Sequence, residues 1–141
     1  IGRICKDVPG ERAQEAIFGF TVANDVTATG GYDADDMIRV KGSDTFCPLG
    51  PWMVTHFSVA EADSVHLRTT VDGTVCQESS TSEMIRSVSE LVSEISSRLT
   101  LLPGDVILTG TPAGVGEIRA GQRVEVEVEG IGSFSNPVVR R

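Results

Sequence analysis

The sequence is poor in the residues that nucleic-acid and membrane binding depend on. Its 141 residues include one Trp and one Tyr, and 12 Lys and Arg are set against 20 Asp and Glu, giving a formal net charge of −8. A surplus of negative charge repels nucleic acid and anionic membranes. So few aromatic side chains also offer no stacking platform for bases. The composition therefore argues against a polyanionic partner.

The sequence also lacks paired cysteines and long apolar runs. Cys5, Cys47 and Cys76 are odd in number and far apart, with no C-x-x-C spacing. We therefore expect buried free thiols, which favour a reducing compartment. No run reaches the roughly 20 apolar residues of a membrane-spanning helix, and no signal peptide is recognisable. A soluble, cytoplasmic protein is the expectation.

Short β-type segments separated by Gly and Pro turns dominate the sequence. Asp72-Gly73 is a strong signal for a two-residue hairpin. At 124–128 valines alternate with glutamates, so one face of a strand is buried. The length and this pattern predict one α+β, predominantly β domain. Strands are expected at 20–26, 52–55, 65–71, 74–78, 106–108, 124–128 and 133–139, with a strand-like start at 1–5.

One long helix is expected between Thr81 and Leu99, where apolar residues recur at helical spacing. Ser80 and Glu83 have the spacing of a capping box at its start. The apolar stripe indicates packing against the core and not a cofactor site. A short helical stretch is also expected at 11–17. The stripe consists of Met84, Ile85, Val88, Leu91, Val92, Ile95 and Leu99.

The segment 101–116, LLPGDVILTGTPAGVG, is the strongest candidate for a binding loop. A short apolar run ends at Thr109-Gly110-Thr111-Pro112, where hydroxyls and backbone N–H groups stand beside glycines that permit close approach. No Gly-Lys-Ser/Thr follows, and the glycine spacing of dinucleotide sites is absent. Nucleotide binding is therefore disfavoured. Taken alone, the segment is more typical of an ordinary turn with small residues in a β-rich domain than of a binding loop.

Three further segments change this interpretation: FGFTVANDVT at 18–27, KGSDTFCPLGPW at 41–52 and VEVEVEGIG at 124–132. Together with 101–116, and in this order, they resemble the catalytic C-terminal domain of the fumarylacetoacetate hydrolase family. The resemblance covers nearly the whole chain, 1–141. It implies a mixed β-roll with one long packed helix, and a homodimer.

The resemblance also implies a divalent cation, Mg²⁺ or Mn²⁺, bound by three carboxylates. One is the aspartate of the Asn-Asp motif, here Asp25, and the other two form a Glu-x-Glu pair on a preceding strand. Oxygen ligands suit such hard cations. Because that pair is missing, we expect residues 1–141 to be a partial domain without its metal-ligand strand.

Two further site residues follow from the same resemblance. Lys41 matches the family's active-site lysine, which binds substrate and stabilises a developing enolate, and Thr111 matches the threonine that binds the substrate carboxylate. Positive charge beside a developing enolate lowers its energy. His56 and His66 lie outside the motifs, and no general acid or base is assigned.

The chain departs from the family pattern after Ala28. The family continues with Arg-Asp and, shortly afterwards, a glutamine, whereas here Thr29 and Gly30 follow. The guanidinium of an arginine binds a carboxylate through two parallel hydrogen bonds, and a threonine at this position cannot make both. Our hypothesis for a replacement is Arg39, two residues before Lys41.

The expected function of the complete protein is that of a metal-dependent hydrolase or isomerase of aromatic catabolism. Its substrates would be 2-oxo acids or 2-hydroxydienoates of the acylpyruvate or hydroxymuconate type. Two alternatives stay open. One is an oxaloacetate decarboxylase using the same enolate stabilisation, and the other is a non-catalytic homologue that binds a small acid or a partner subunit.

Overall fold

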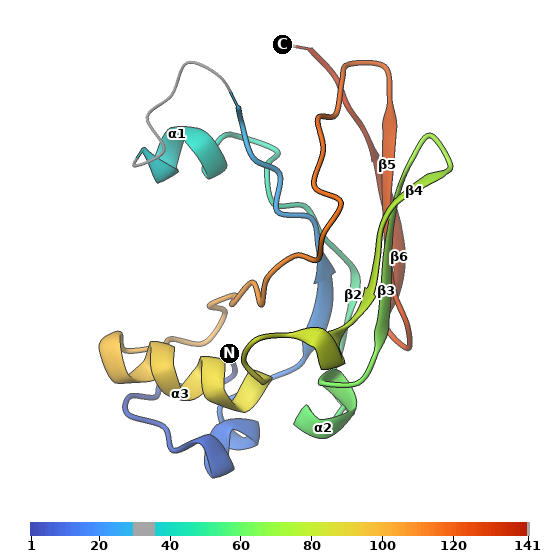
Figure 1. Ribbon diagram of the computed structural model, residues 1–141. Helices are drawn as coiled ribbons and strands as arrows, with labels where there is room; N and C mark the ends of the chain where they lie inside the picture. The colour runs from blue at the N-terminus through green and yellow to red at the C-terminus, as the bar shows by residue number, and fades with distance from the viewer. Residues whose placement is uncertain (30–35, 141) are drawn as a thin grey trace.

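The computed structural model describes residues 1–29 and 36–140, in which two antiparallel sheets stand beside a small helical layer (Figure 1). The larger sheet has four strands in the order β4-β3-β5-β6, and the smaller one pairs β1 with β2. The predicted class, α+β with mostly strand, is confirmed. The strands are β1 (Phe20–Ala23), β2 (Leu49–Val54), β3 (His66–Val71), β4 (Thr74–Ser80), β5 (Arg123–Val128) and β6 (Gly132–Pro137).

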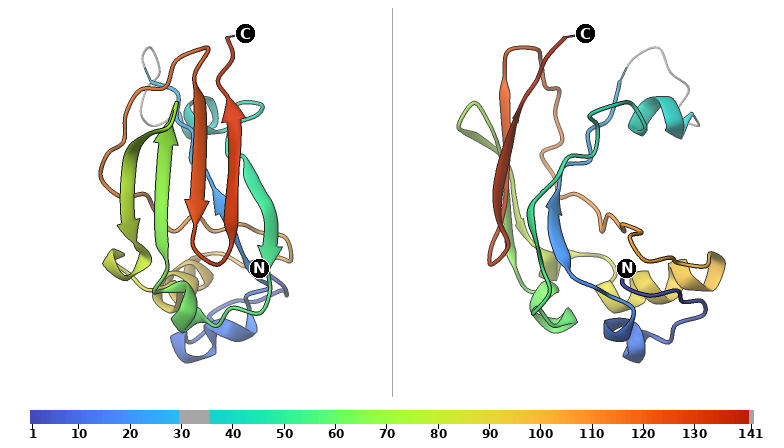
Figure 2. Two further views of the ribbon diagram at one scale, coloured as in Figure 1. Left: turned by 90° about the vertical axis from the view of Figure 1, so that its right-hand side faces the viewer. Right: turned by 180° about the vertical axis from the view of Figure 1, so that it is seen from behind.

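The core lies between the two sheets, and the alternation of β5 places it there. Val124 and Val126 are 5% and 6% exposed, whereas Glu125 and Glu127 between them are exposed. The valines pack in one cluster with Val22 of β1. Burial of each valine side chain contributes about 1.5–3 kcal/mol relative to exposure. Figure 2 shows the four-stranded sheet face-on in its left view and β1 and β2 beside it in its right view.

The hairpin between β3 and β4 forms at Asp72-Gly73, as predicted. Both residues have positive φ, 50° and 80°, as a turn matching the twist of the strands requires. The Asp72 carboxylate accepts a hydrogen bond from the backbone N–H of Arg123 at 2.8 Å. The turn is thereby tied to the start of β5.

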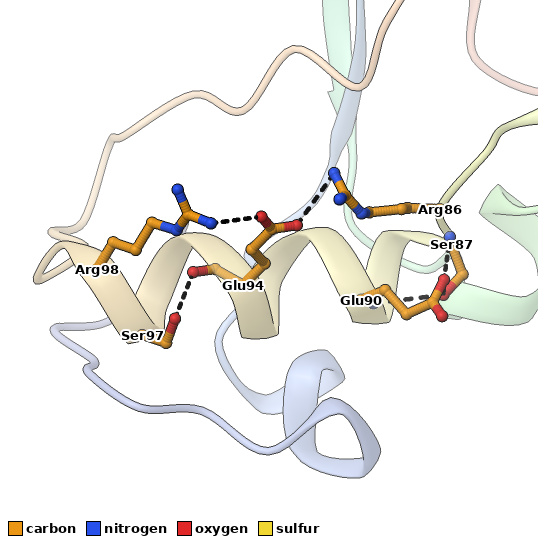
Figure 3. Close-up of polar contacts among 6 residues, drawn as sticks. All are labelled: Arg86, Ser87, Glu90, Glu94, Ser97 and Arg98. Atoms are coloured by element: carbon orange, nitrogen blue, oxygen red, sulfur yellow. Dashed lines mark hydrogen bonds and ion pairs between the residues drawn. The ribbon is translucent and has the colours of Figure 1, made fainter.

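The predicted long helix is wrong in its first half. Residues Thr81–Glu83 form a single 3₁₀ turn, η2, and the α-helix α3 begins only at Val88 and ends at Arg98. The capping box that starts α3 joins Ser87 and Glu90, not Ser80 and Glu83 (Figure 3). Because Ser87 satisfies the free N–H groups at this point, the helix begins here. Ile85, assigned to the apolar stripe, is fully exposed.

The N-terminal segments match expectation in part. The predicted strand at 1–5 is a single bridge between Cys5 and Leu101, whereas the short helical stretch predicted at 11–17 is present as the 3₁₀ helix η1, Gly10–Glu15. The small side chains of Ala13 and Ala16 pack against Val92, which joins η1 to α3. The other helices are α1 (Met37–Lys41) and α2 (Val59–Ala62).

Two further predictions are corrected. The expected strand at 106–108 is irregular chain, because Ile107 packs on the η1–α3 cluster instead of joining a sheet. All three cysteines are free as expected, but none is fully buried and Cys76 is exposed. In the part of the chain that the structure describes, no helix is long and apolar enough to cross a membrane. The polar, glycine-bearing sequence at 30–36 predicts a loop, and this segment falls almost wholly outside the described residues.

Removing the Ser87–Glu90 capping box at the start of α3 should lower the stability of the protein by an amount that depends on pH. Hydrogen bonds from the Ser87 backbone N–H and hydroxyl lower the pKa of Glu90. Its contribution is therefore complete above the ordinary glutamate pKa of about 4.3, and is lost as the pH falls through the lower folded-state pKa. Ser87→Ala should lower the free energy of unfolding at pH 7 by about 1 kcal/mol.

Chemical unfolding of wild type and of Ser87→Ala at pH 7 and at pH 3 measures this difference in the free energy of unfolding. Ser89→Ala, in the same helix, is the matched control and should change stability much less. Equal effects of the two substitutions would contradict the capping role of Ser87.

Candidate functional site

A cavity of about 1130 Å³ brings together the three residues assigned from the sequence, Asp25, Lys41 and Thr111. They come from separate parts of the chain: the segment after β1, the last turn of α1, and the segment between α3 and β5. The inner faces of β3 and β5 complete the lining with side chains such as Leu67 and Val126. The site is thus a polar rim on a largely apolar cavity, as in many small-molecule sites.

Asp25 and Lys41 form an ion pair at the edge of this cavity. The Lys41 ammonium donates to Asp25 Oδ2 at 2.5 Å and to Thr27 Oγ1 at 3.1 Å. Both charged side chains are about one-third exposed, 34% for Lys41 and 37% for Asp25, so water or a ligand can reach the pair.

The backbone holds the two sides of this pair together. The Ala28 N–H donates to the carbonyl of Val40 at 2.8 Å, which ties the segment after β1 to α1. The Asn24 N–H donates to the carbonyl of Pro48 at 3.1 Å, just before β2. Because Lys41 is the last residue of α1, these bonds bring its side chain to Asp25.

Thr111 is held from the other side of the cavity by Gln77 of β4, a residue that sequence reasoning missed. Gln77 Nε2 donates to Thr111 Oγ1 at 2.8 Å and to the carbonyl oxygen of Pro112 at 2.9 Å. Gln77 is paired with Thr69 in the sheet and also lines the cavity. A polar amide on the inward face of a strand was the signal that could have found it.

The loop that carries Thr111 also lies directly against β4. A Cβ atom added to Gly114 would clash with the carbonyl oxygen of Cys76, and Gly114 has a φ of +98°. Only glycine permits both the close approach and this backbone conformation. The position of the loop therefore depends on Gly114 as well as on Gln77.

The described residues do not complete a metal site by themselves. Within residues 1–29 and 36–140, no group of three or more His, Cys, Asp and Glu is placed to hold a metal ion. Asp25 supplies one carboxylate, and its Oδ2 is held by an ammonium group. A divalent cation in this cavity therefore requires further oxygen ligands.

The hypothesis that Arg39 replaces the family's arginine is wrong. Arg39 pairs with Asp36 at 3.1 Å, is largely exposed, and is not among the residues that line the cavity. His56 and His66 do not line it either. Thr29 does, whereas Gly30, the second residue of the departure from the family pattern, lies outside the described residues.

Comparison with known proteins identifies the family. The model of the fumarylacetoacetate (FAA) hydrolase C-terminal domain matches residues 1–139. The chain belongs to the fumarylacetoacetate hydrolase family. Its mixed fold, mostly strand with few helices, is that of the family members of known structure.

Similar members are named as isomerases, hydrolases and a tautomerase. A crystal structure of 5-carboxymethyl-2-hydroxymuconate delta-isomerase from Mycobacterium smegmatis has a TM-score of 0.90 and 52% identity, over 100% of this chain and 55% of that one. Maleylpyruvate hydrolase from Sphingobium sp. SYK-6, in complex with manganese(II) and pyruvate, has a TM-score of 0.89 and 30% identity, over 99% and 50%.

A bovine mitochondrial oxaloacetate tautomerase of this family is 40% identical, over 99% of this chain and 48% of its own length. The chain spans about half the length of the curated relatives it matches.

The contact of Gly114 with β4 predicts that this glycine is more sensitive to substitution than others of similar conformation. Gly104 has a φ of +93° and open space where its Cβ would lie, so Gly104→Ala is a matched control. Both substitutions carry a conformational cost on the order of 1–3 kcal/mol. Gly114→Ala adds a steric clash and should destabilise by about 1–3 kcal/mol more.

Thermal unfolding measures the stability of the two variants, and hydrogen exchange of the backbone amides at 109–116 measures how firmly the loop is held in each. We expect faster exchange of these amides in Gly114→Ala than in Gly104→Ala. Indistinguishable variants would show that the loop does not depend on this contact.

Proposed function

We propose that the protein containing this chain is a hydrolase or isomerase that acts on 2-oxo acids or 2-hydroxydienoates through a stabilised enolate. The observation that carries this proposal is the meeting of Asp25, Lys41 and Thr111 in one cavity. The names of the similar family members support it, because hydroxymuconate and maleylpyruvate are acids of these classes. Acylpyruvates and hydroxymuconate-type diacids, as in aromatic catabolism, are the proposed substrates.

Lys41 and Thr111 have complementary parts in this proposal. An ammonium has three hydrogens, and Lys41 uses two of them on Asp25 and Thr27, which within the described residues leaves one for a substrate oxygen. Its positive charge stabilises negative charge that develops on an enolate oxygen. The Thr111 hydroxyl donates to the substrate carboxylate, which fixes the orientation of the acid.

We further propose that the activity depends on a divalent cation, Mg²⁺ or Mn²⁺, with Asp25 as one ligand. A bound cation supplies Lewis-acid polarisation of the substrate carbonyl. The manganese and pyruvate in the maleylpyruvate hydrolase structure support this part of the proposal. In this chain the Lys41 ammonium holds Asp25 Oδ2, so the cation and Lys41 compete for the same carboxylate.

A homodimer and a cytoplasmic location are also part of the proposal. Leu49 and Trp52 are exposed apolar side chains on β2 that lie outside the cavity lining, and they offer a surface for a second copy. The free cysteines agree with a reducing compartment. The proposed partner in the cavity is a small acid.

Oxaloacetate is a second candidate substrate, because the bovine relative is named an oxaloacetate tautomerase. Tautomerisation moves a proton between the keto and enol forms and passes through the enolate of oxaloacetate itself. Decarboxylation releases carbon dioxide and leaves the enolate of pyruvate, and in both cases the negative charge develops on the oxygen of the 2-oxo group. Ultraviolet absorbance follows the enol, and a coupled assay follows carbon dioxide. These two readouts separate a tautomerase from a decarboxylase and from a hydrolase of acylpyruvates.

Calorimetry of Mg²⁺ and Mn²⁺ in the presence of oxalate tests the metal proposal on the full product of the gene and on residues 1–141. Asp25→Asn should weaken cation binding strongly. Asp7→Asn is the matched control, because Asp7 also accepts a hydrogen bond from a lysine, Lys6, but does not line the cavity. Unchanged affinity in Asp25→Asn would remove Asp25 from the metal site.

Because the cation and the Lys41 ammonium compete for the Asp25 carboxylate, removing the ammonium should change cation affinity in the opposite direction to Asp25→Asn. Lys41→Met should tighten cation binding severalfold, because a partly exposed ion pair contributes up to about 1 kcal/mol. The same variant should lose most of its turnover. If neither the cation nor any acid of the three classes binds the full gene product, the non-catalytic homologue becomes the better description.

A further inference from the structure

We propose that Gln77 is a positioning residue that directs the Thr111 hydroxyl into the cavity as a hydrogen-bond donor, and thereby selects carboxylate ligands. The inference deepens the proposed function and rests on it, since it assigns the Thr111 hydroxyl to the bound acid. Gln77 lies on β4 and Lys41 at the end of α1, both residues line the cavity, and Figure 1 shows these two elements on opposite sides of the molecule.

The two hydrogen bonds of Gln77 determine which way its amide points. Nε2 lies 2.9 Å from the carbonyl oxygen of Pro112, and a carbonyl oxygen only accepts hydrogen bonds. The nitrogen, and not the oxygen, of the Gln77 amide must therefore face the loop. This settles the orientation that is otherwise ambiguous for a glutamine side chain.

The second hydrogen of the same amide then determines the direction of the Thr111 hydroxyl. Nε2 lies 2.8 Å from Thr111 Oγ1, which accepts this hydrogen. A hydroxyl that accepts from Gln77 keeps its own hydrogen for another acceptor. Because Thr111 lines the cavity, its hydroxyl hydrogen is available to an acid bound there.

The support behind Gln77 makes the orientation stable. β4 is held along its length by β3, with Gln77 opposite Thr69. The loop cannot retreat from β4 without losing the close packing of Gly114 on the Cys76 carbonyl. A donor whose direction is fixed before binding loses less entropy when the ligand arrives.

The consequence is a preference among ligands. A carboxylate accepts at both oxygens, and because it is ionised it accepts a stronger hydrogen bond from the Thr111 hydroxyl than the single neutral carbonyl oxygen of an amide does. A 2-oxo acid is therefore selected over the corresponding 2-oxo amide.

Gln77→Glu tests the inference because it keeps the shape and reverses the hydrogen bonding. An ionised glutamate only accepts, so the Thr111 hydroxyl turns to it and presents lone pairs to the ligand. At low pH a protonated Glu carries one hydrogen and restores a donor. The control Gln14→Glu adds the same charge outside the cavity and keeps the acceptor that the Val59 N–H uses.

The measurement is the affinity of oxalate, with Mg²⁺ or Mn²⁺ present, from about pH 4, just below the ordinary glutamate pKa, to about pH 8 in the full gene product. At pH 8 we expect Gln77→Glu to weaken oxalate binding at least about tenfold, as expected for a lost hydrogen bond to a charged group. Relative to wild type, the affinity should recover as the pH falls. Gln77→Met should lose affinity equally at every pH, and Gln14→Glu should match wild type.

A double-mutant cycle separates orientation from charge repulsion and from misfolding. In a Thr111→Val background, Gln77→Glu should cost less affinity than in wild type, because no hydroxyl remains to be turned. Equal losses in both backgrounds would overturn the inference, as would a Gln77→Met protein that binds oxalate like wild type. If wild type itself neither binds oxalate nor turns over any acid, the proposed function fails, and this inference fails with it.

Discussion

The burial of one face of β5 is the constraint on which the rest of the molecule depends. β5 is an interior strand of the larger sheet, between β3 and β6, and its valines meet Val22 of β1 in the core. This contact determines the position in space of β1, and Asp25 lies two residues after the last residue of that strand. The metal-ligand candidate is therefore placed by sheet packing and not by local sequence.

The opposite wall of the cavity depends on β4, which has no strand beyond it within the described residues. Its partner on that side is the irregular loop that carries Thr111, joined through Gln77 and Gly114. Edge strands leave unpaired backbone groups that proteins commonly cover. The loop that lies against β4 also carries the Thr111 hydroxyl that faces the cavity. The same segment therefore packs on the edge of the sheet and contributes to the candidate site.

The sequence predicts the sheets well because their signals are local. Alternation in β5 and the Asp72-Gly73 turn both follow from short-range chemistry, and both were confirmed. The start of α3 was misplaced because Ser80 and Ser87 each precede a glutamate by three residues, so the pattern alone does not choose between two caps. The choice is made by tertiary packing, which buries Val88 and leaves Ile85 exposed.

The candidate site was predictable only in part, for a similar reason. A resemblance assigns residues whose identity is characteristic, and Asp25, Lys41 and Thr111 are brought to one cavity. Gln77 acts through another residue, and its partner is 34 positions away in the sequence. No local pattern reports such a contact. The ammonium that holds Asp25 Oδ2 was likewise visible only in three dimensions.

Charge imposes a last requirement on how this cavity binds an acid. The chain has a formal net charge of −8, so its long-range field repels the anionic ligand that the site is proposed to take. At physiological ionic strength that repulsion is screened beyond about 8 Å. In the proposed function, affinity then comes from groups in direct contact: the Lys41 ammonium, the Thr111 hydroxyl and a cation. Lys41 is largely neutralised while Asp25 holds it, and a cation that takes over Asp25 returns that charge to the cavity. Cation and acid should therefore bind cooperatively, each making the site more favourable for the other.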